Sequence, residues 1–129
     1  MKVQNIFYIG VVLISIFWSC EKYDGPAGIT GIWEVQEITT QGTPKFYNVS
    51  VEAFGDNDST KFIILNFYDA GMDFETTVEL KDSIFTIISG NSIEYSIQGT
   101  GVLHKKSFTI DWQYSITGDP YVQAHFEKP

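Results

Sequence analysis

The sequence predicts an all-β protein, an eight-stranded antiparallel up-and-down barrel. Short segments of alternating apolar and polar residues follow one another from Gly31 onward, separated by turn residues. No segment has the period of a helix. A meander of eight strands would leave two unpaired edges, and closure into a barrel removes them. A two-sheet β-sandwich is the alternative architecture.

The stretch from Ser92 to Ile116 is expected to form the central hairpin of this sheet. We place its turn at residues 104–107, so that Leu103 pairs with Phe108. One face of the hairpin is then apolar and aromatic, and the other is polar, because strand side chains alternate. Glycines stand opposite large side chains and let the wall curve around an interior. The expected pairs are Gly101 with Ile110, Gly99 with Trp112, Ile97 with Tyr114 and Tyr95 with Ile116.

The other strands are expected on either side of this hairpin. In the third of them, we expect Ile63, Leu65 and Phe67 to point inward, and Phe62 and Ile64 to point outward. The last strand is expected after a three-residue loop, Gly118–Asp119–Pro120, so that Val122 faces Ile116, Ala124 faces Tyr114 and Phe126 faces Trp112. The predicted ranges are 31–40, 46–54, 60–68, 74–80, 83–89 and 121–127.

Length and charge limit the possible functions. The chain has 129 residues, enough for one domain, and a formal net charge of −8 with no arginine. Nucleic acid binding is therefore not expected, because it needs clustered lysine and arginine. Attraction to anionic lipid by charge alone is not expected either.

The N-terminal residues resemble the signal peptide of a bacterial lipoprotein. Lys2 gives a positive start, and Ile6 to Phe17 is an apolar run that is short for a membrane span. The following residues, Phe17-Trp18-Ser19-Cys20, resemble a lipobox, although Trp18 and Phe17 depart from the usual residues. We expect a signal peptide at 1–19, a lipidated tether at 20–30 and a barrel domain at 31–129. The alternative is an N-terminal membrane anchor with an incidental cysteine.

This resemblance implies a location. The thiol of Cys20, the only cysteine, would carry fatty acyl chains such as palmitate, and several chains make an anchor lasting. The expected location is the outer membrane, on its periplasmic or cell-surface face, with the membrane contacted through lipid.

The barrel itself resembles the lipocalins. Gly31-Ile32-Trp33 is similar to their Gly-x-Trp signature, which implies that Trp33 closes one end of the barrel. The stretches 97–101 and 108–114 look like the C-terminal half of small lipocalin-like lipoproteins of gut-type Gram-negative bacteria. The C-terminal helix and arginine of lipocalins are absent here. Members of this group largely lack an assigned activity, so the resemblance implies a fold more than a function.

No pattern in the sequence predicts an enzyme, a metal site or a cofactor. Residues 56–59 resemble the start of a calcium loop but lack its later glycine and glutamate, which favours a simple turn. His104 and His125 lie on different strands and are expected at the surface. Glu37 shares its face with Trp33 and is expected near the barrel rim.

Two short motifs suggest modification after export. Asp58-Ser59-Thr60 and Asp82-Ser83-Ile84 resemble the O-glycosylation pattern of exported proteins in the same bacterial group. Both lie beside predicted turns, so Ser59 and Ser83 are candidate sites. Ordinary turn chemistry is the alternative.

Two binding functions remain open. In the first, the barrel holds a small apolar or aromatic ligand, with Tyr47, Phe67, Tyr95, Trp112 and Tyr114 lining the site. The alternative use of these rings is to fill the core of the barrel. In the second function, a filled barrel acts as an interaction module of the cell envelope, and an exposed apolar patch that includes the outward Phe62 and Ile64 binds a protein or a glycan. An open interior cavity would favour the first function, and a filled barrel with an exposed patch the second.

Overall fold

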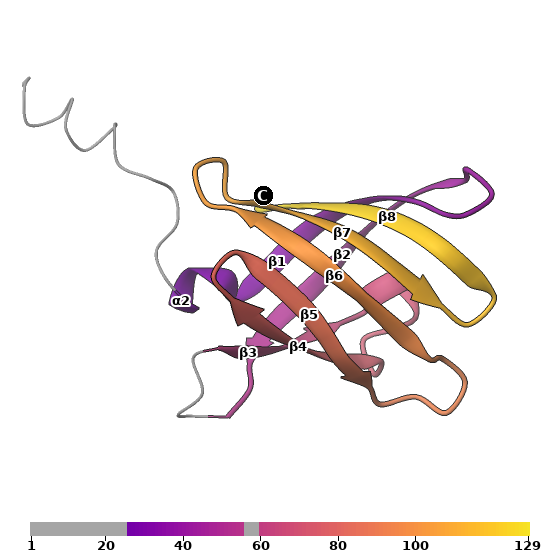
Figure 1. Ribbon diagram of the computed structural model, residues 1–129, viewed down its shortest axis with the longest axis horizontal. Helices are drawn as coiled ribbons and strands as arrows, with labels where there is room; N and C mark the ends of the chain where they lie inside the picture. The colour runs from indigo at the N-terminus through magenta and orange to yellow at the C-terminus, as the bar shows by residue number, and fades with distance from the viewer. Residues whose placement is uncertain (1–25, 56–59) are drawn as a thin grey trace, which may run out of the picture.

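The computed structural model describes residues 26–55 and 60–129, which form a closed eight-stranded antiparallel barrel with its strands in sequence order (Figure 1). This confirms the predicted fold class. The barrel closes because β1 pairs with both β2 and β8. The strands are β1 (Gly31–Ile38), β2 (Pro44–Ala53), β3 (Lys61–Leu65), β4 (Glu75–Lys81), β5 (Ile84–Gly90), β6 (Ile97–His104), β7 (Thr109–Ile116) and β8 (Asp119–Glu127).

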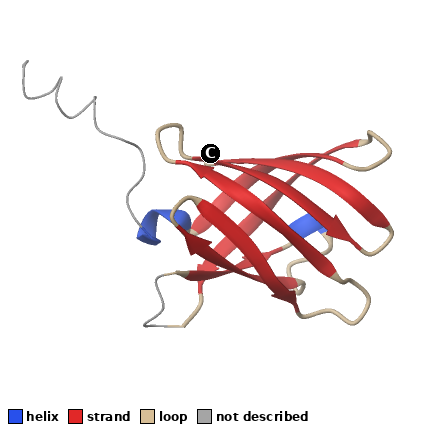
Figure 2. Ribbon diagram, viewed as in Figure 1, coloured by secondary structure: helices blue, strands red, loops and turns tan. Residues whose placement is uncertain are grey.

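Two short helical segments mark the two ends of the barrel (Figure 2). The α2 end carries the helical turn α2 (Pro26–Ile29), the β4–β5 and β6–β7 turns and the C-terminus. The η1 end carries the 3-10 turn η1 (Phe67–Asp69) and the β1–β2, β5–β6 and β7–β8 connections.

The barrel interior is the hydrophobic core. Alternate residues of each strand point into it, as on β1, where Trp33, Val35 and Glu37 are buried. On β7, the residues Ile110, Trp112, Tyr114 and Ile116 are buried in the same way.

The central hairpin forms between β6 and β7, but the predicted register is wrong by two residues. Leu103 pairs with Ile110, and the turn comprises residues 105–108. A shift of two keeps every side chain on its predicted face, so the periodicity alone does not reveal it. Gly101 rather than Gly99 therefore faces Trp112, whose ring lies 2.7 Å from where a Cβ at residue 101 would be. The remaining observed pairs include Gly99 with Tyr114 and Ile97 with Ile116.

The predicted orientation of the third strand is wrong. Phe62 and Ile64 point inward and are buried, whereas Ile63 and Leu65 are partly exposed. Phe67 is buried as predicted, but it belongs to η1 and not to β3. The expected patch of outward Phe62 and Ile64 therefore does not exist.

The last strand begins earlier than predicted. The turn before it is Thr117–Gly118, and Asp119 pairs with Ile116 and is buried. The pairing of β7 with β8 also shifts by two residues, so that Val122 faces Tyr114, Ala124 faces Trp112 and Phe126 faces Ile110.

The packing of the barrel begins before residue 31. Residues 26–29, expected to be an irregular tether, form a helical turn, and Ile29 is fully buried in the core. The signal peptide, Cys20 and Ser59 lie outside the described residues. In the part of the chain that the structure describes, no helix is both long and apolar enough to span a bilayer.

Candidate functional sites

The predicted ligand pocket is filled by the rings that were expected to line it. Phe67, Trp112 and Tyr114 are almost completely buried. The ring centroid of Phe67 lies 5.1 Å from that of Trp112, 4.7 Å from that of Tyr114 and 5.6 Å from that of Phe126. These distances are those of packed aromatic pairs, so the rings form the core of the barrel.

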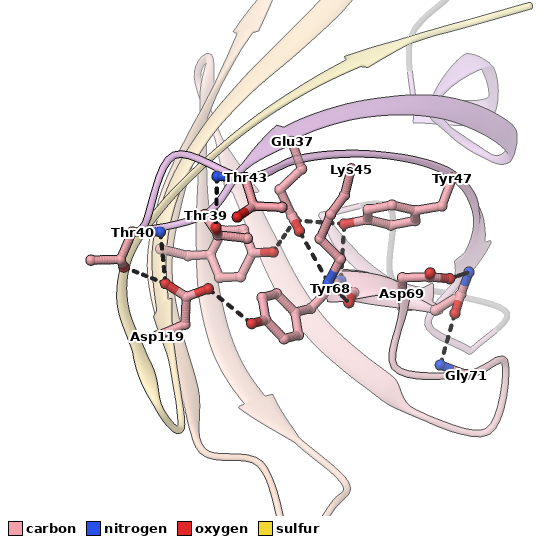
Figure 3. Close-up of polar contacts among 12 residues, drawn as sticks. Glu37, Thr39, Thr40, Thr43, Lys45, Tyr47, Tyr68, Asp69, Gly71 and Asp119 are labelled. Atoms are coloured by element: carbon pink, nitrogen blue, oxygen red, sulfur yellow. Dashed lines mark hydrogen bonds and ion pairs between the residues drawn. The ribbon is translucent and has the colours of Figure 1, made fainter.

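The other two predicted ligand residues lie at the η1 end. Tyr47 is partly buried and points toward Glu37 (Figure 3). Tyr95 precedes β6, is partly buried and packs against Phe74 with a centroid distance of 5.5 Å. The structure therefore does not bring all five predicted residues into one site.

Trp33 lies at the α2 end of the barrel, beside Ile29 and Phe108. Its indole Nε1 donates a hydrogen bond to the carbonyl oxygen of Ile29 at 2.8 Å. Its ring packs against Phe108 at 5.2 Å, and the Lys128 Nζ lies 5.1 Å from its centroid. Phe108 reaches this position from the β6–β7 turn with a φ of 56°. This end of the barrel is closed mainly by apolar packing.

A buried carboxylate lies at the η1 end. Glu37 is only 1% exposed, and its Oε1 accepts hydrogen bonds from the hydroxyls of Tyr114 and Tyr47, the latter at 2.7 Å (Figure 3). Its Oε2 has no hydrogen-bond partner among the described residues. The nearest cation is the Lys45 Nζ, 3.8 Å from Oε2. At that distance the two groups form an ion pair, but they are too far apart for a hydrogen bond.

Burial raises the pKa of Glu37 above its ordinary value of 4.5, although the tyrosine hydrogen bonds and Lys45 oppose the shift. Burial and the neighbouring Glu37 charge likewise raise the pKa of Tyr47, which keeps its hydroxyl protonated as a donor. The carboxylate is thus held by neutral hydroxyls in a partly desolvated place.

A second carboxylate extends this network to the rim. Asp119 accepts hydrogen bonds at Oδ1 from the backbone N–H of Thr40, at 2.9 Å, and from its hydroxyl. At Oδ2 it accepts one from the Tyr68 hydroxyl at 2.8 Å. Burial pushes the pKa of Asp119 up, but these hydrogen bonds outweigh it and hold the pKa below its ordinary value. Burial and Asp119 together raise the pKa of Tyr68 to about 12.

The segment that carries Tyr68 has an unusual backbone. Asn66, Tyr68 and Asp69 have φ values of 73°, 63° and 57°, in the left-handed region that non-glycine residues rarely adopt. The side chain of Asn66 stabilises the segment by donating to the carbonyl oxygen of Asn48 and accepting from the N–H of Gly71, both at 2.8 Å. Strain of this kind concentrates at functional sites.

A groove with a volume of about 440 Å³ lies on the outer surface of the barrel. It crosses β7, β8, β1 and β2 between two rows of outward side chains. The register places Asp111, His125, Gln36 and Phe46 in the first row, and Gln113, Gln123, Ile38 and Pro44 in the second. Between the rows, the floor of the groove is formed at Trp112, Ala124 and Glu37, whose side chains point into the barrel.

The walls of the groove combine amides with apolar surface. Phe46 is 74% exposed and Ile38 is 53% exposed, and both lie on neighbouring strands. Within residues 26–55 and 60–129, the side-chain amides of Gln36 and Gln113 make no hydrogen bond to the rest of the protein. This groove can therefore offer both hydrogen-bonding groups and a flat ring to a bound molecule.

The two histidines are at the surface, and the fold brings them to the same carboxylate. The Nε2 of His104 lies 2.9 Å from Asp111 Oδ2, and the Nδ1 of His125 lies 2.5 Å from Asp111 Oδ1. The other ring nitrogen of His125 lies 2.9 Å from Glu127. Burial opposes protonation of His125, but these carboxylates outweigh it and raise its pKa above 6.5. No group of metal-ligating side chains suited to an ion occurs within the described ranges.

Ser83 lies in the two-residue turn between β4 and β5 and is partly exposed. Its carbonyl oxygen accepts a hydrogen bond from the N–H of Leu103 at 2.7 Å. Its position beside a turn agrees with the sequence expectation, and modification of it stays a prediction.

Sequence reasoning missed most of both sites. Lys45, Tyr68 and Asp119 were not singled out, because their contacts with Glu37 and Thr40 depend on how turns of different strands meet at one end. The outer groove was missed because its rows join strands from the two ends of the chain. The one available signal was Glu37, a carboxylate on the inward face of a strand.

No protein-family model matches the chain, and neither does any curated protein sequence. Among solved structures, the chain is similar to a redesigned β-barrel, mFAP1, bound to DFHBI, with a TM-score of 0.58 and 9% identity over 82% of this chain and 100% of that one. A second redesigned β-barrel also has a TM-score of 0.58 and 9% identity, over 85% of this chain and 99% of that one. At this identity the likeness concerns the fold: a small closed β-barrel.

Proposed function

We propose that this protein is a lipid-anchored, non-enzymatic binding module of the outer membrane, and that its outer groove binds a short neutral glycan. One observation carries the proposal: the barrel interior is filled by its own rings, whereas the groove on β7, β8, β1 and β2 is open. A filled barrel then acts as a rigid scaffold, and recognition takes place on its outer surface.

The chemistry of the groove favours a glycan. The free amides of Gln36 and Gln113 each offer donors and an acceptor, which suits hydroxyl groups that both donate and accept. The exposed ring of Phe46 offers an apolar face for a sugar ring. The groove crosses four strands, or about 14 Å at the usual strand spacing, which is enough for a short oligosaccharide.

Charge and topology argue against other occupants. The protein carries a net charge of −8, and Asp111 lies in the groove wall, so an acidic polymer would be repelled. An extended peptide commonly binds by adding a strand to an open sheet edge, and a closed barrel offers none.

The lipid anchor in this proposal rests on the sequence around Cys20. The described chain enters the barrel at Pro26, at the α2 end (Figure 1). Pro26 follows Cys20 by six positions, a length of chain that reaches at most about 22 Å. Lipidation of Cys20 would therefore keep the α2 end near the bilayer and direct the η1 end away from it.

Binding to short neutral oligosaccharides, measured by glycan array and then by calorimetry, tests this function. We expect Phe46→Ala to weaken binding about fivefold, because a stacked ring contributes about 1 kcal/mol. Ile88→Ala, an exposed apolar change on β5, is the matched control and should leave affinity unchanged. Absence of glycan binding, or binding only to peptides, would contradict the proposal.

A second candidate function is a small apolar or aromatic ligand inside the barrel. The buried Nε1 of Trp112 and Oγ1 of Thr76 have no hydrogen-bond partner among the described residues, which favours it. One structural neighbour carries DFHBI. Native mass spectrometry of protein purified from its host tests this candidate, because an interior ligand would co-purify at one copy per chain.

A further inference from the structure

The ammonium of Lys45 is bound at the η1 end as if it were a ligand. Its Nζ donates a hydrogen bond to the carbonyl oxygen of Tyr68 at 3.1 Å and lies 3.8 Å from the centroid of the same ring. The same atom forms the 3.8 Å ion pair with Glu37 Oε2 (Figure 3). A carbonyl, a ring face and a carboxylate are the groups by which proteins recognise an ammonium.

The carboxylate of this site is incompletely satisfied. The two tyrosine hydroxyls bond only to Oε1 of Glu37, and Oε2 is buried without a donor in the part of the chain that the structure describes. A buried acceptor without a hydrogen-bond donor costs free energy, because it has lost its bonds to water. An ammonium placed closer to Oε2 than Lys45 is would remove this cost.

We propose that the Glu37–Tyr68 site binds the primary ammonium of a small organic amine, with Lys45 as an internal competitor. Glu37 belongs to the floor of the outer groove, but its carboxylate points into the barrel, and the proposal does not depend on glycan binding. The ligand must carry at least two N–H groups, as a primary ammonium does, because it has to donate to both Oε2 of Glu37 and the carbonyl oxygen of Tyr68. A quaternary ammonium has no N–H to donate, and an anion would meet Glu37 and Asp119.

Lys45 can leave the site without unfolding the barrel. It is the second residue of β2, at the η1 end, and its side chain is 29% exposed. The stem of a lysine is flexible, so its ammonium can move into water and leave its place to a competitor. The left-handed segment around Tyr68 forms the other wall.

The test uses the full chain and propylammonium chloride as the probe. In Lys45→Ala, we expect saturable binding seen as a rise in melting temperature and as shifts of the Tyr68 amide in NMR spectra. Wild-type protein should bind the probe at least about tenfold more weakly, since Lys45 competes. The double variant with Glu37→Gln should lose the response, and tetramethylammonium should produce none.

Lys128→Ala provides the matched control. The Nζ of Lys128 also lies over a ring, that of Trp33, and donates to a carbonyl, that of Thr30 at 2.5 Å. No carboxylate pairs with it in the described residues, so this variant should not gain a propylammonium site. If Lys45→Ala does not fold, Lys45→Ser is measured in its place. An equal response in Lys128→Ala, a response that survives Glu37→Gln, or no response in either Lys45 variant would overturn the proposal.

Discussion

The two ends of the barrel are closed in the same way, by an inserted aromatic side chain, but they differ in their charged groups. At each end, an aromatic side chain enters the interior from a connection with left-handed backbone: Phe108 at the α2 end and Phe67 at the η1 end. Each end also holds a lysine ammonium over a ring. The difference is the pair of carboxylates, Glu37 and Asp119, at the η1 end.

Because of this difference, the α2 end mainly stabilises the fold, whereas the η1 end carries the buried polar groups. Apolar packing around Trp33 stabilises the fold in proportion to the surface that it buries. Burying a carboxylate costs free energy: the hydrogen bonds of Glu37 offset this cost only in part, whereas those of Asp119 outweigh it. Carboxylates perturbed in this way are typical of functional sites. Variants at the two ends should therefore differ in how much unfolding free energy they lose and in how that loss depends on pH.

The largest expected effect is at the α2 end. Trp33→Ala should lower the free energy of unfolding by about 3–5 kcal/mol, because it removes a fully buried ring and leaves a cavity under Phe108. Urea unfolding measures this change. Ile32→Ala, an outward and 44% exposed neighbour on β1, is the control. Equal losses in the two variants would show that Trp33 does not close the barrel.

The next largest effect is at the η1 end. Glu37→Ala removes the acceptor of the Tyr47 and Tyr114 hydroxyls, and we expect a loss of about 2 kcal/mol in the same assay. Glu34→Ala, on the exposed face of the same strand, should change stability by less than about 0.5 kcal/mol. If Glu37→Ala left the free energy of unfolding unchanged, the hydrogen-bond network would contribute nothing to the stability of the fold.

Tyr68→Phe should have a smaller effect, a loss of about 1 kcal/mol. It removes only the hydroxyl that donates to Asp119, and it keeps the ring under Lys45. Tyr121→Phe, which removes the hydroxyl of a 57% exposed ring, is the matched control and should be nearly neutral. Thermal unfolding of the three proteins makes the comparison. If Tyr68→Phe and Tyr121→Phe lost the same stability, the hydrogen bond from Tyr68 to Asp119 would not contribute to the fold.

The pH dependence should also differ between the ends. Because burial raises the pKa of Glu37 in the folded state, its contribution to stability is fully present below about pH 4.5 and is lost as pH rises through the folded-state pKa. The unfolding free energy of wild-type protein should therefore fall relative to that of Glu37→Gln between pH 4 and pH 8, the range of the assay. Trp33→Ala, which removes no titrating group, should not change this pH profile. A wild-type advantage that grows with pH would contradict the assigned direction.

The sequence alone predicted the closed barrel, the strand order and the inward faces of β1 and β7. It did not predict register, because a slip of two residues leaves every face unchanged. The register is decided by the β6–β7 turn, where Phe108 takes a left-handed φ and packs against Trp33. That contact joins residues 75 positions apart, which no local pattern reveals.

The face of β3 could not be read from its residues, because both faces are apolar. Counting back from Phe67 gave the wrong parity, since the strand ends at Leu65 and Asn66 turns the chain with a left-handed φ. For the site, alternation placed Glu37, Tyr47 and Tyr114 correctly on the inward face. It could not show that Asp119 is a strand residue, nor that Lys45 and Tyr68 meet at the same end.

A filled barrel should bind its partner on its outer surface. A map of backbone amide shifts in NMR spectra, recorded while short neutral oligosaccharides are added, tests it most directly. We predict that shifts concentrate at Gln36, Phe46, Gln113 and Gln123 and leave Phe67 and Phe85, which are buried and do not line the groove, unchanged. Shifts centred on Phe67, Phe85 and Tyr114, with none in the groove, would contradict it.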